Sequence, residues 1–182
     1  ILKSIAEIRA YRKAGASSVG FVPTMGALHS GHCSLVERSR NETDLTIVSV
    51  YVNPTQFNNA NDLANYPETL TVDLQLLKAS GVSAVFIPTY ELLYPDDYAY
   101  EVDEKHFSRE LCGENRPGHF TGVLTVVMKL LNLVKPQKAY FGEKDFQQLS
   151  LVKGMAKAFF LETEIIGCPT VREDDGLAMS SR

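Results

Sequence analysis

The sequence predicts an α/β fold in which a doubly wound parallel sheet carries helices on both faces. Short apolar runs alternate with helical patterns along nearly all of the 182 residues. One of these runs, residues 45–52, is rich in β-branched residues, as expected for a strand that is buried on both faces. Parallel strands need long crossover connections that are usually helical, so this alternation favours a parallel sheet with right-handed crossovers.

The first element is predicted to be an amphipathic helix over residues 1–15. Ile1, Ile5 and Ile8 recur at helical spacing on one face, and Gly15 ends the run. The next elements alternate in type: we expect strands over residues 19–23 and 45–52, a helix over residues 32–40, and a helix over residues 69–80 that is closed by Gly81.

The helix over residues 69–80 is expected to bury the face that carries Leu70, Leu74 and Leu77. The second half of the chain continues the alternation, although residues 90–118 are irregular. We expect strands over residues 82–88, 98–102, 138–141 and 164–167, helices over residues 122–134 and from residues 142–145 to 160, and a loop over residues 170–182.

Composition indicates an ordinary globular chain without a nucleic-acid partner. Apolar residues make up 45% and charged residues 22% of the chain, and the formal net charge is −4 without any basic block. Cys33, Cys112 and Cys168 form no CxxC pair and no metal-ligand pattern, so we expect reduced thiols in a cytoplasmic protein. The most apolar run, residues 122–134, is too short to cross a membrane and contains Lys129, so we expect a buried helix and no membrane partner.

Four polar motifs follow predicted strands. In a doubly wound sheet the carboxyl ends of the strands meet at one edge, and ligands bind there, where the strand order reverses. We therefore expect the four motifs to build one site. They are His29-Ser30-Gly31-His32, Asn53-Pro54-Thr55-Gln56-Phe57, Gly142-Glu143-Lys144-Asp145 and Ser180-Ser181-Arg182.

His29 and His32 lie at the expected start of a helix. Such a terminus presents unpaired backbone N–H groups and a partial positive charge to an anion. Two imidazoles three residues apart can face the same anion, so the pattern suits the phosphates of a nucleotide and favours a nucleotide-using enzyme. The alternative is that either histidine caps the helix or packs against it.

Lys144 stands at another helix start, where its charge opposes the helix dipole, and a bound phosphate would explain its position. Asp145 can accept hydrogen bonds from ribose hydroxyls, and Gln148 can reach the same cavity. The alternative is a solvated capping run whose glutamine points to water.

The other two motifs suit an acid and a triphosphate. Gln56 both donates and accepts hydrogen bonds and therefore suits a hydroxy acid, with Phe57 as a wall of the cavity; the alternative is a plain turn. Ser180, Ser181 and Arg182 offer two hydroxyls and a guanidinium to phosphate; the alternative is a loose chain end.

The segment Arg116-Pro117-Gly118-His119 precedes the apolar helix. We expect it to anchor that turn rather than to take part in chemistry. Val123, Val126 and Val127 are expected in the core, with one edge open to the methyl groups of a substrate.

Five blocks together resemble one family. They are PTMGALHSGH at residues 23–32, VNPTQF at 52–57, RPGHFTGV at 116–123, FGEKDFQQL at 141–149 and DGLAMSSR at 175–182. Their content and order closely resemble the pantothenate synthetase (pantoate–β-alanine ligase) family, over about residues 19–182. That family belongs to the HxGH nucleotidyltransferases, so the resemblance implies a Rossmann-like fold of that type.

The resemblance also implies a two-step reaction that supplies a precursor of coenzyme A. ATP adenylates the carboxylate of pantoate and releases pyrophosphate. The amine of β-alanine then attacks the acyl adenylate, which gives pantothenate and AMP. Two other functions stay open at this point: a transferase that joins a nucleotide to a phosphorylated substrate, and a module that only binds nucleotide.

Site residues follow from the resemblance, position by position. The catalytic group would be His29, His32, Lys144, Ser180, Ser181 and Arg182, with His32 in the family's proton-donor position. ATP would contact Met25, Gly26, Ala27, Leu28, His29, Ser30, Gly31, His32, Gly142, Glu143, Lys144, Asp145, Val171, Met179, Ser180, Ser181 and Arg182. Pantoate and β-alanine would contact Pro23, Met25, Asn53, Gln56, Phe57, Val126, Val127 and Gln148.

The resemblance further implies Mg²⁺, a homodimer and a second domain. Mg²⁺ would be held through the ATP phosphates rather than by protein ligands. Residues 1–182 are expected to form the ATP- and pantoate-binding domain, with the family's smaller C-terminal lid domain outside this chain. Without that lid we expect little turnover.

Overall fold

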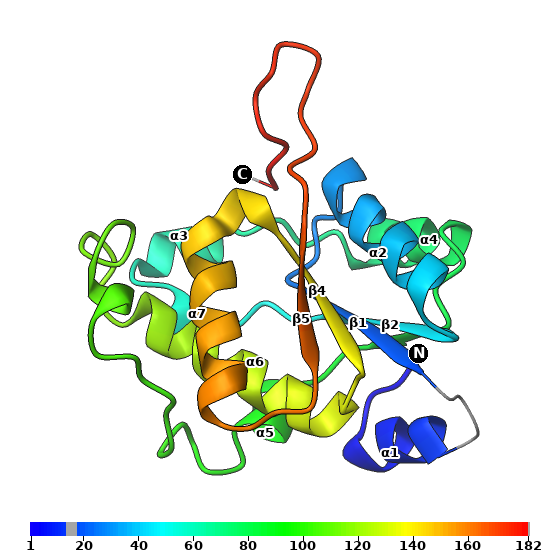
Figure 1. The fold of residues 1–182 in the computed structure, drawn as a ribbon, viewed down its shortest axis with the longest axis horizontal. Coiled ribbons are helices and arrows are strands. Elements are labelled where there is room, and N and C mark those ends of the chain that lie inside the picture. Colours follow the sequence, from blue (N-terminus) through cyan, green and yellow to red (C-terminus); the bar gives the residue numbers. More distant parts are fainter. Residues whose placement is uncertain (14–17, 182) are drawn as a thin grey trace.

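The computed structural model describes residues 1–13 and 18–181. At its centre is a five-stranded parallel sheet with the strand order β3-β2-β1-β4-β5, drawn in Figure 1. The α/β prediction with a doubly wound parallel sheet is therefore confirmed. The strands are β1 (Val19–Thr24), β2 (Leu45–Val50), β3 (Ala84–Phe86), β4 (Lys138–Gly142) and β5 (Glu164–Cys168).

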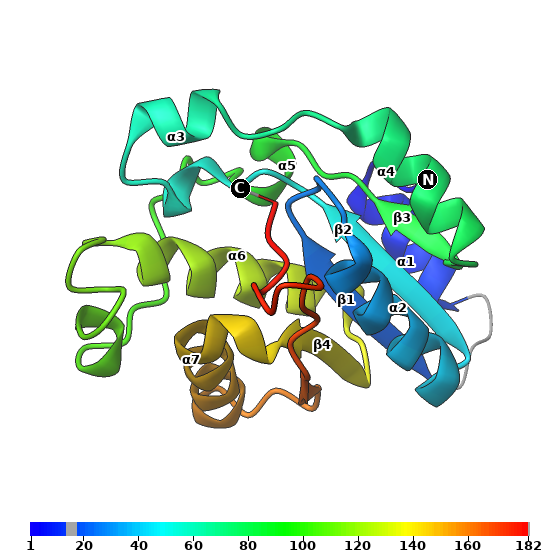
Figure 2. The ribbon, with the colours of Figure 1, turned by 90° about the horizontal axis from the view of Figure 1, so that it is seen from above.

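Helices cover both faces of this sheet. Figure 2 shows α2 and α6 on opposite sides of β1. One face carries α1 (Ile5–Lys13), α5 (Tyr90–Leu93), α6 (His119–Val134) and α7 (Phe146–Ala158). The other carries α2 (Ser30–Glu42) and α4 (Leu70–Ala79), while the short α3 (Ala60–Ala64) lies in the connection from β2 to α4.

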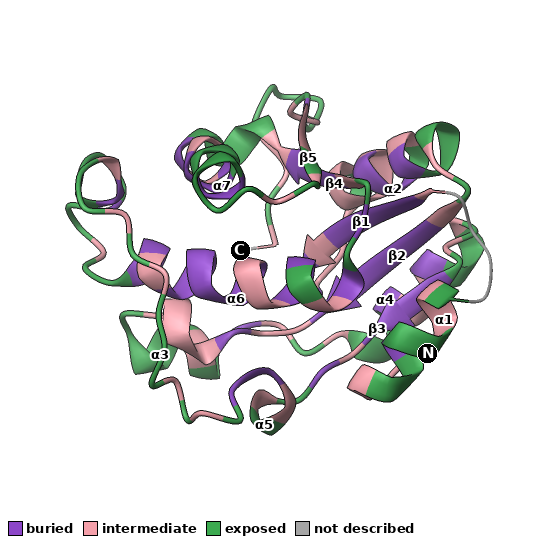
Figure 3. Cartoon of the chain, turned by 60° about the horizontal axis from the view of Figure 1, so that its bottom comes forward, coloured by how far each residue is buried: buried purple, intermediate pink, exposed green. Residues whose placement is uncertain are grey.

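The two cores follow from the pleat of the central strand. Successive side chains of a strand point to opposite faces, so Phe21 packs in the core with α6 and Val22 packs in the core with α2. Both side chains are fully buried. Figure 3 shows the same burial along β1, β2 and much of α6, which explains why the sequence of α6 is apolar almost all round.

One predicted element is wrong, and the first helix is confirmed with a later start. The first helix begins at Ile5 rather than at residue 1, because Leu2 instead pairs with Phe86 as a parallel bridge. The strand expected over residues 98–102 is not formed: Tyr98 has a φ of 62°, and the N–H of Val102 donates to Thr125 Oγ1 at 2.9 Å. The predicted helix end at Gly15 lies outside the described residues.

Other elements are confirmed with shifted boundaries. Helix α2 begins at Ser30 and α6 at His119, both earlier than expected. A 3₁₀ turn over Glu143–Asp145 precedes α7, which ends at Ala158. Helices α3 and α5 were not expected, and the predicted terminal loop contains an antiparallel bridge between Arg172 and Ala178.

The strand order indicates where a ligand site is expected. The chain builds β1, β2 and β3 outward to one side and then returns to add β4 and β5 on the other side of β1. The order therefore reverses between β1 and β4, where the following segments separate and leave room for a ligand. Among the described residues, no helix is both long enough and apolar enough to cross a membrane.

Candidate active site

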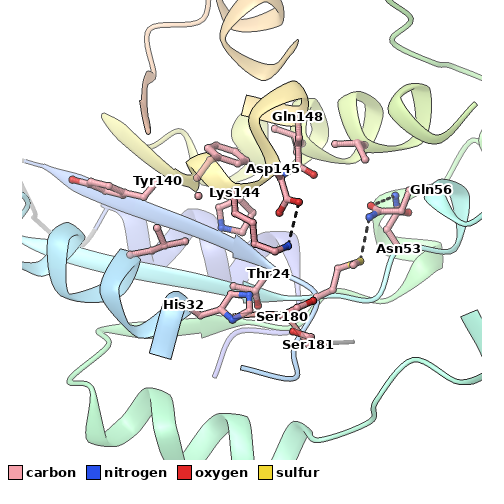
Figure 4. Close-up of a pocket in the computed structure, with 18 of the residues that line it drawn as sticks. Thr24, His32, Asn53, Gln56, Tyr140, Lys144, Asp145, Gln148, Ser180 and Ser181 are labelled. Carbon is pink, nitrogen blue, oxygen red and sulfur yellow. Dashed lines mark hydrogen bonds and ion pairs between the residues drawn. The ribbon is translucent and has the colours of Figure 1, made fainter. Parts of the chain in front are cut away.

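A cavity of about 270 Å³ lies at this reversal point, beyond the carboxyl ends of the strands (Figure 4). It collects most of the candidates named from the sequence. Those that line it are Pro23, Met25, His29, Gly31, His32, Asn53, Gln56, Phe57, Val126, Val127, Gly142, Lys144, Asp145, Gln148, Val171, Met179, Ser180 and Ser181. The candidates Gly26, Ala27, Leu28, Ser30 and Glu143 are not part of its lining, and Arg182 lies outside the described residues.

The turn after β1 is held by a carboxylate that the sequence motifs did not indicate. Asp73 on α4 is 2% exposed, and its two oxygens accept the N–H groups of Ala27 at 3.0 Å and Leu28 at 2.9 Å. The Thr69 hydroxyl donates to the same side chain at 3.0 Å. Asp73 therefore fixes the backbone that leads into the histidine motif.

Gly26 is required for this arrangement. Its φ of 84° is in the left-handed region, and a Cβ there would lie 3.0 Å from Asp73 Oδ2. The sequence held one signal for the buried carboxylate. Asp73 falls three residues after Leu70 and four before Leu77, on the face that was expected to be apolar, although Leu70 itself is 42% exposed.

The two histidines cap α2 reciprocally. The N–H of Gly31 donates to His29 Nδ1 at 3.1 Å, and the N–H of His29 donates to His32 Nδ1 at 3.3 Å. The rings lie 4.2 Å apart between centroids. An Nδ1 that accepts a hydrogen bond carries no proton, so each neutral ring keeps its hydrogen on Nε2. The two histidines therefore cap α2, as the alternative interpretation expected, and they also line the cavity.

This capping corrects the expectation that the helix start offers unpaired amides. The N–H groups of His29 and Gly31 donate to imidazoles, and that of His32 donates to the His29 carbonyl at 2.8 Å. An anion at this helix start therefore meets the Nε2–H groups of the rings and the helix dipole, rather than these three amides.

Burial keeps both imidazoles neutral. It is the main cause that lowers the pKa of His32 to about 4, and a positive charge on His29 would lower it further, while Asp73 opposes the shift. The pKa of His29 is lowered by burial and by the Lys144 ammonium. Near neutral pH the rings are therefore hydrogen-bond donors through Nε2, and not cations.

Lys144 supplies the positive charge on this side of the cavity. It follows β4, and Figure 4 shows its amine on the same side as His32. Its Nζ lies 3.4 Å from Asp145 Oδ1, and both side chains are partly exposed. Such a pair contributes little to folding, so both groups remain available to a ligand.

Amide groups form the other side of the cavity. Asn53 is buried, and its Nδ2 donates to Gln56 Oε1 at 3.1 Å. The Nε2 of Gln56 lies 3.2 Å from the Met25 sulfur, which is a weak acceptor. Figure 4 shows this pair across the cavity from His32 and Lys144, with Gln148 above. His32 and Lys144 thus lie apart from the Asn53–Gln56 pair.

The terminal segment returns over the turn after β1. The Ser181 hydroxyl donates to the Ala27 carbonyl at 2.8 Å, and the N–H of Met179 donates to the Val171 carbonyl at 3.1 Å. In Figure 2 this segment runs between α2 and α6. Ser180 and Ser181 are therefore brought to the cavity, and Ser181 is bonded to the motif that holds His29.

The apolar wall contains residues that the sequence motifs did not indicate. Phe57 lies edge-on to Tyr66, with ring centroids 5.8 Å apart, and both line the cavity. Phe57 was expected there from its motif, whereas no local pattern marks Tyr66. The other unexpected lining residues are Thr24, Leu35, Tyr51, Arg116, His119, Leu130, Tyr140, Phe141, Pro169 and Thr170, whereas Val123 lines the cavity as expected.

The neighbouring glutamine has a structural role. Gln147 is buried: its amide donates to the carbonyls of Phe107 and Glu110, both at 2.7 Å, and it accepts the N–H of Cys112 at 3.1 Å. It fixes the loop over residues 107–112, whereas Gln148 lines the cavity.

The described residues do not form a metal cluster. No group of three His, Cys, Asp or Glu side chains among residues 1–13 and 18–181 is placed to hold an ion. Asp145 is the one carboxylate in the described lining. The three cysteines carry free thiols, of which only Cys112 is exposed.

Known proteins match this chain over all or most of its length. The profile of the family described as pantoate-beta-alanine ligase matches residues 1–182. Pantothenate synthetase of Bdellovibrio bacteriovorus is 54% identical over 182 residues, which are 100% of this chain and 72% of that protein. Pantothenate synthetase of Coxiella burnetii is 59% identical over 165 residues, or 91% of this chain and 64% of that protein.

Solved structures agree with the sequence matches. Pantoate-beta-alanine ligase from Francisella tularensis, complexed with beta-gamma ATP and beta-alanine, superposes with a TM-score of 0.96 at 45% identity, over 100% of this chain and 71% of that one. The enzyme from Thermus thermophilus gives a TM-score of 0.93 at 49% identity, over 99% of this chain and 65% of that one. The chain thus spans about two thirds of the length of these relatives, and it belongs to the pantoate-beta-alanine ligase family.

Proposed function

We propose that this chain condenses pantoate with β-alanine in two steps that consume ATP. In the first step a carboxylate oxygen of pantoate attacks the α-phosphorus of ATP, and the bond to the β-phosphate breaks, releasing pyrophosphate. In the second step the β-alanine amine attacks the acyl carbon of pantoyl adenylate, AMP leaves with its oxygen, and the amine loses a proton. The products are pantothenate and AMP.

The observation that carries this proposal is the division of the cavity into two unlike sides. Charge builds up on the leaving pyrophosphate, so this step needs donors already aimed at that position. Lys144, His29 and His32 line the cavity, and the Lys144 ammonium and the Nε2–H groups left free by the bonded Nδ1 atoms suit that role. The amides of Asn53 and Gln56 lie across the cavity from His32 and Lys144 (Figure 4) and suit an uncharged or singly charged acid.

His32 acts in this scheme as a neutral donor. Its family position is that of a proton donor, but a ring with a pKa of about 4 carries no extra proton near neutral pH. It can still donate its Nε2–H to a phosphate oxygen and keep the hydrogen throughout. The role we propose is therefore stabilisation of charge rather than transfer of a proton.

The acid would occupy the amide side. Gln56 and Gln148 would hold the carboxylate and hydroxyl groups of pantoate, and Gln56 would also meet β-alanine. Asn53 would lie against the acid beside Gln56, with its own side-chain hydrogens already bonded to Gly122 and Gln56. The methyl groups of pantoate would pack on the apolar lining, which includes Pro23, Met25, Phe57, Val126 and Val127.

The rest of ATP would extend along the ends of β4 and β5. Asp145 would accept from the ribose hydroxyls, and the backbone at Val171 would lie near the adenine. Gly142 and Glu143 complete that strand end, and Met25 to His32 complete the histidine side. Met179, Ser180, Ser181 and Arg182 would close over the triphosphate, for which the bond from Ser181 to the Ala27 carbonyl gives a starting position.

Mg²⁺ would be bound through the phosphates. The donor set of the cavity suits an anion, with Asp145 as the single carboxylate among the described lining residues. When bound, the ion would neutralise phosphate charge. The residues of this chain would do the rest by orienting the triphosphate.

We further propose a cytoplasmic homodimer. The three free thiols support a reducing compartment. The dimer rests on the family resemblance, and sedimentation equilibrium checks it. A lid domain like that of longer family members would exclude water from the adenylate, so we expect slow turnover from residues 1–182 alone.

Isotope exchange between pyrophosphate and ATP tests the first step. Exchange that requires pantoate supports the ligase. Exchange that ignores pantoate and follows a phosphate monoester would favour a nucleotidyltransferase instead. Calorimetry with pantoate and with ATP on the same sample reports binding even where turnover is slow, and ATP binding without any pantoate binding would contradict the proposal.

A further inference from the structure

One backbone group identifies which atom of the Asn53 amide is the nitrogen. The Nδ2 of Asn53 lies 3.2 Å from the carbonyl oxygen of Gly122, which can only accept a hydrogen bond. The atom that faces this carbonyl must therefore be the nitrogen. Its second hydrogen points to Gln56 at 3.1 Å, so the Gln56 atom there must be the acceptor, Oε1.

The orientation of the Asn53 amide also sets the orientation of the Gln56 amide at the cavity. With Oε1 turned to Asn53, Gln56 presents its NH₂ group towards Met25 and the cavity (Figure 4). The Met25 sulfur is a weak acceptor that a substrate oxygen can replace. Gln56 is thereby set as a donor, and this side of the cavity selects a ligand with an oxygen lone pair.

The hydrogen-bonded series that begins at Gln56 continues through Asn53 into the core. Asn53 Oδ1 accepts the hydroxyl of Tyr94 at 2.8 Å and the hydroxyl of Thr55 at 3.1 Å. Tyr94 is 2% exposed and is not part of the cavity lining. Burial raises the pKa of Tyr94 to about 12, so the phenol keeps its proton and donates it at any physiological pH.

Packing prevents the Tyr94 ring from turning away. Its centroid lies 4.9 Å from that of Tyr90 and 5.4 Å from that of Tyr98, and the Lys129 ammonium lies 4.8 Å from its centre. Because the ring is packed on these sides, its hydroxyl stays directed at Asn53 Oδ1. Tyr94 therefore has the rigidity that a positioning residue needs.

The main chain of the loop is held separately by the start of α6. The ring of His119 bonds the Gln56 carbonyl through Nδ1 at 2.7 Å. A Cβ on Gly122 would lie 2.4 Å from the Thr55 carbonyl oxygen, so only glycine permits this approach. These contacts place the Gln56 backbone, and they leave the direction of its side-chain amide to Asn53 and Tyr94.

We propose that Tyr94 is a positioning residue for recognition of the acid, acting through Asn53 to hold the Gln56 NH₂ group towards the cavity. The claim about the acid rests on the proposed function, because pantoate is the ligand that Gln56 would meet. The orienting chain from Tyr94 to Gln56 does not depend on which ligand binds. The two parts can therefore be tested apart.

The variant Tyr94→Phe removes only the hydroxyl, and Tyr90→Phe is its matched control. Tyr90 belongs to the same ring stack, but its hydroxyl bonds exposed Asp97 at 3.4 Å. Loss of one hydrogen bond typically corresponds to a several-fold change in an equilibrium. We expect Tyr94→Phe to shift the side-chain NH₂ resonances of Asn53 and Gln56 and to weaken pantoate binding about fivefold, on that basis.

ATP affinity separates positioning from general damage. Calorimetry should show unchanged ATP binding in Tyr94→Phe, and Tyr90→Phe should match the parent in every measurement. Thr55→Val, which removes the second hydroxyl on Asn53 Oδ1, should shift the same resonances even if Tyr94→Phe does not fold.

Three results would overturn the proposal: Gln56 resonances that stay in place in Tyr94→Phe and Thr55→Val, resonances that move while pantoate affinity is unchanged, or equal losses of ATP and pantoate affinity. If the parent chain binds no pantoate, the proposed function fails. The NH₂ resonances then decide the orienting chain alone.

Discussion

The backbone N–H of His29 donates to the Nδ1 of His32 at 3.3 Å, and the two rings lie 4.2 Å apart. This contact fixes the tautomer of His32, because a nitrogen that accepts cannot hold a hydrogen. The free hydrogen must then sit on Nε2. The same contact that caps the helix therefore leaves the Nε2–H of His32 as a donor for an anion.

Removal of His32 should therefore affect chemistry more than folding. We expect His32→Ala to lower the rate of pantoate-dependent pyrophosphate exchange by roughly 10²–10³-fold, as for loss of one donor to a developing charge. The exposed His106 lies elsewhere in the chain, and His106→Ala should leave the rate unchanged. A rate for His32→Ala within a few-fold of the parent would limit His32 to its capping role.

The lowered pKa of His32 also predicts how stability depends on pH. The folded pKa is about 4, below the ordinary value of 6.5, so protonation is easier in the unfolded chain. The stabilisation is therefore complete above about pH 6.5 and is lost as the pH falls towards 4. Urea unfolding should show this decline in the parent and a smaller one in His32→Gln; equal declines would contradict the assignment.

Asp73 should hold the turn that leads into the histidine motif in its observed shape. In Asp73→Asn one of the backbone donors, Ala27 or Leu28, faces an NH₂ group instead of an oxygen. An unmet buried donor costs about 1–3 kcal/mol, so we expect a loss of that size in urea unfolding. ATP affinity should fall as well.

Asp62→Asn is the control for this variant, because Asp62 is exposed on α3. It should leave both stability and ATP affinity unchanged. If Asp73→Asn binds ATP as tightly as the parent, the turn does not need the carboxylate to hold its shape.

The close approach of α6 to the Asn53 loop is also testable. Gly122→Ala places a Cβ 2.4 Å from the Thr55 carbonyl, so the loop that carries Gln56 must move. We expect weaker pantoate binding by calorimetry. Gly154→Ala in α7 is the matched control: nothing lies within 4 Å of its Cβ position, and it should stabilise the chain by up to about 1 kcal/mol through helix propensity. Equal pantoate affinity in the two variants would contradict this account of the loop.

Much of the sheet and the position of the site could be predicted from the sequence. The strands β1, β2, β4 and β5 are short apolar runs, and their local pattern was enough to identify them as strands. Polar motifs directly follow three of them. Their meeting at one edge is a property of any parallel sheet. The placement of His29, Gln56 and Lys144 around one cavity followed from that rule.

What could not be predicted depends on contacts between distant segments. Leu2 leaves the helical pattern to pair with Phe86, and Tyr98 takes a positive φ where a strand was expected. Asp73 and Tyr94 act on the site from α4 and from the residue after α5, and no local motif links them to it. Capping by a histidine was an open alternative, but the sequence did not show that each imidazole accepts a backbone N–H of the same motif.

A crystal structure of this chain with ATP, Mg²⁺ and pantoate is the most direct measurement of the two-sided cavity. We predict phosphate oxygens within hydrogen-bond distance of Nε2 of His29 and His32, with Lys144 beside them and the pantoate carboxylate on the Gln56 side. A triphosphate bound among the amides, or imidazoles turned from it while pantoate lies elsewhere, would contradict this arrangement.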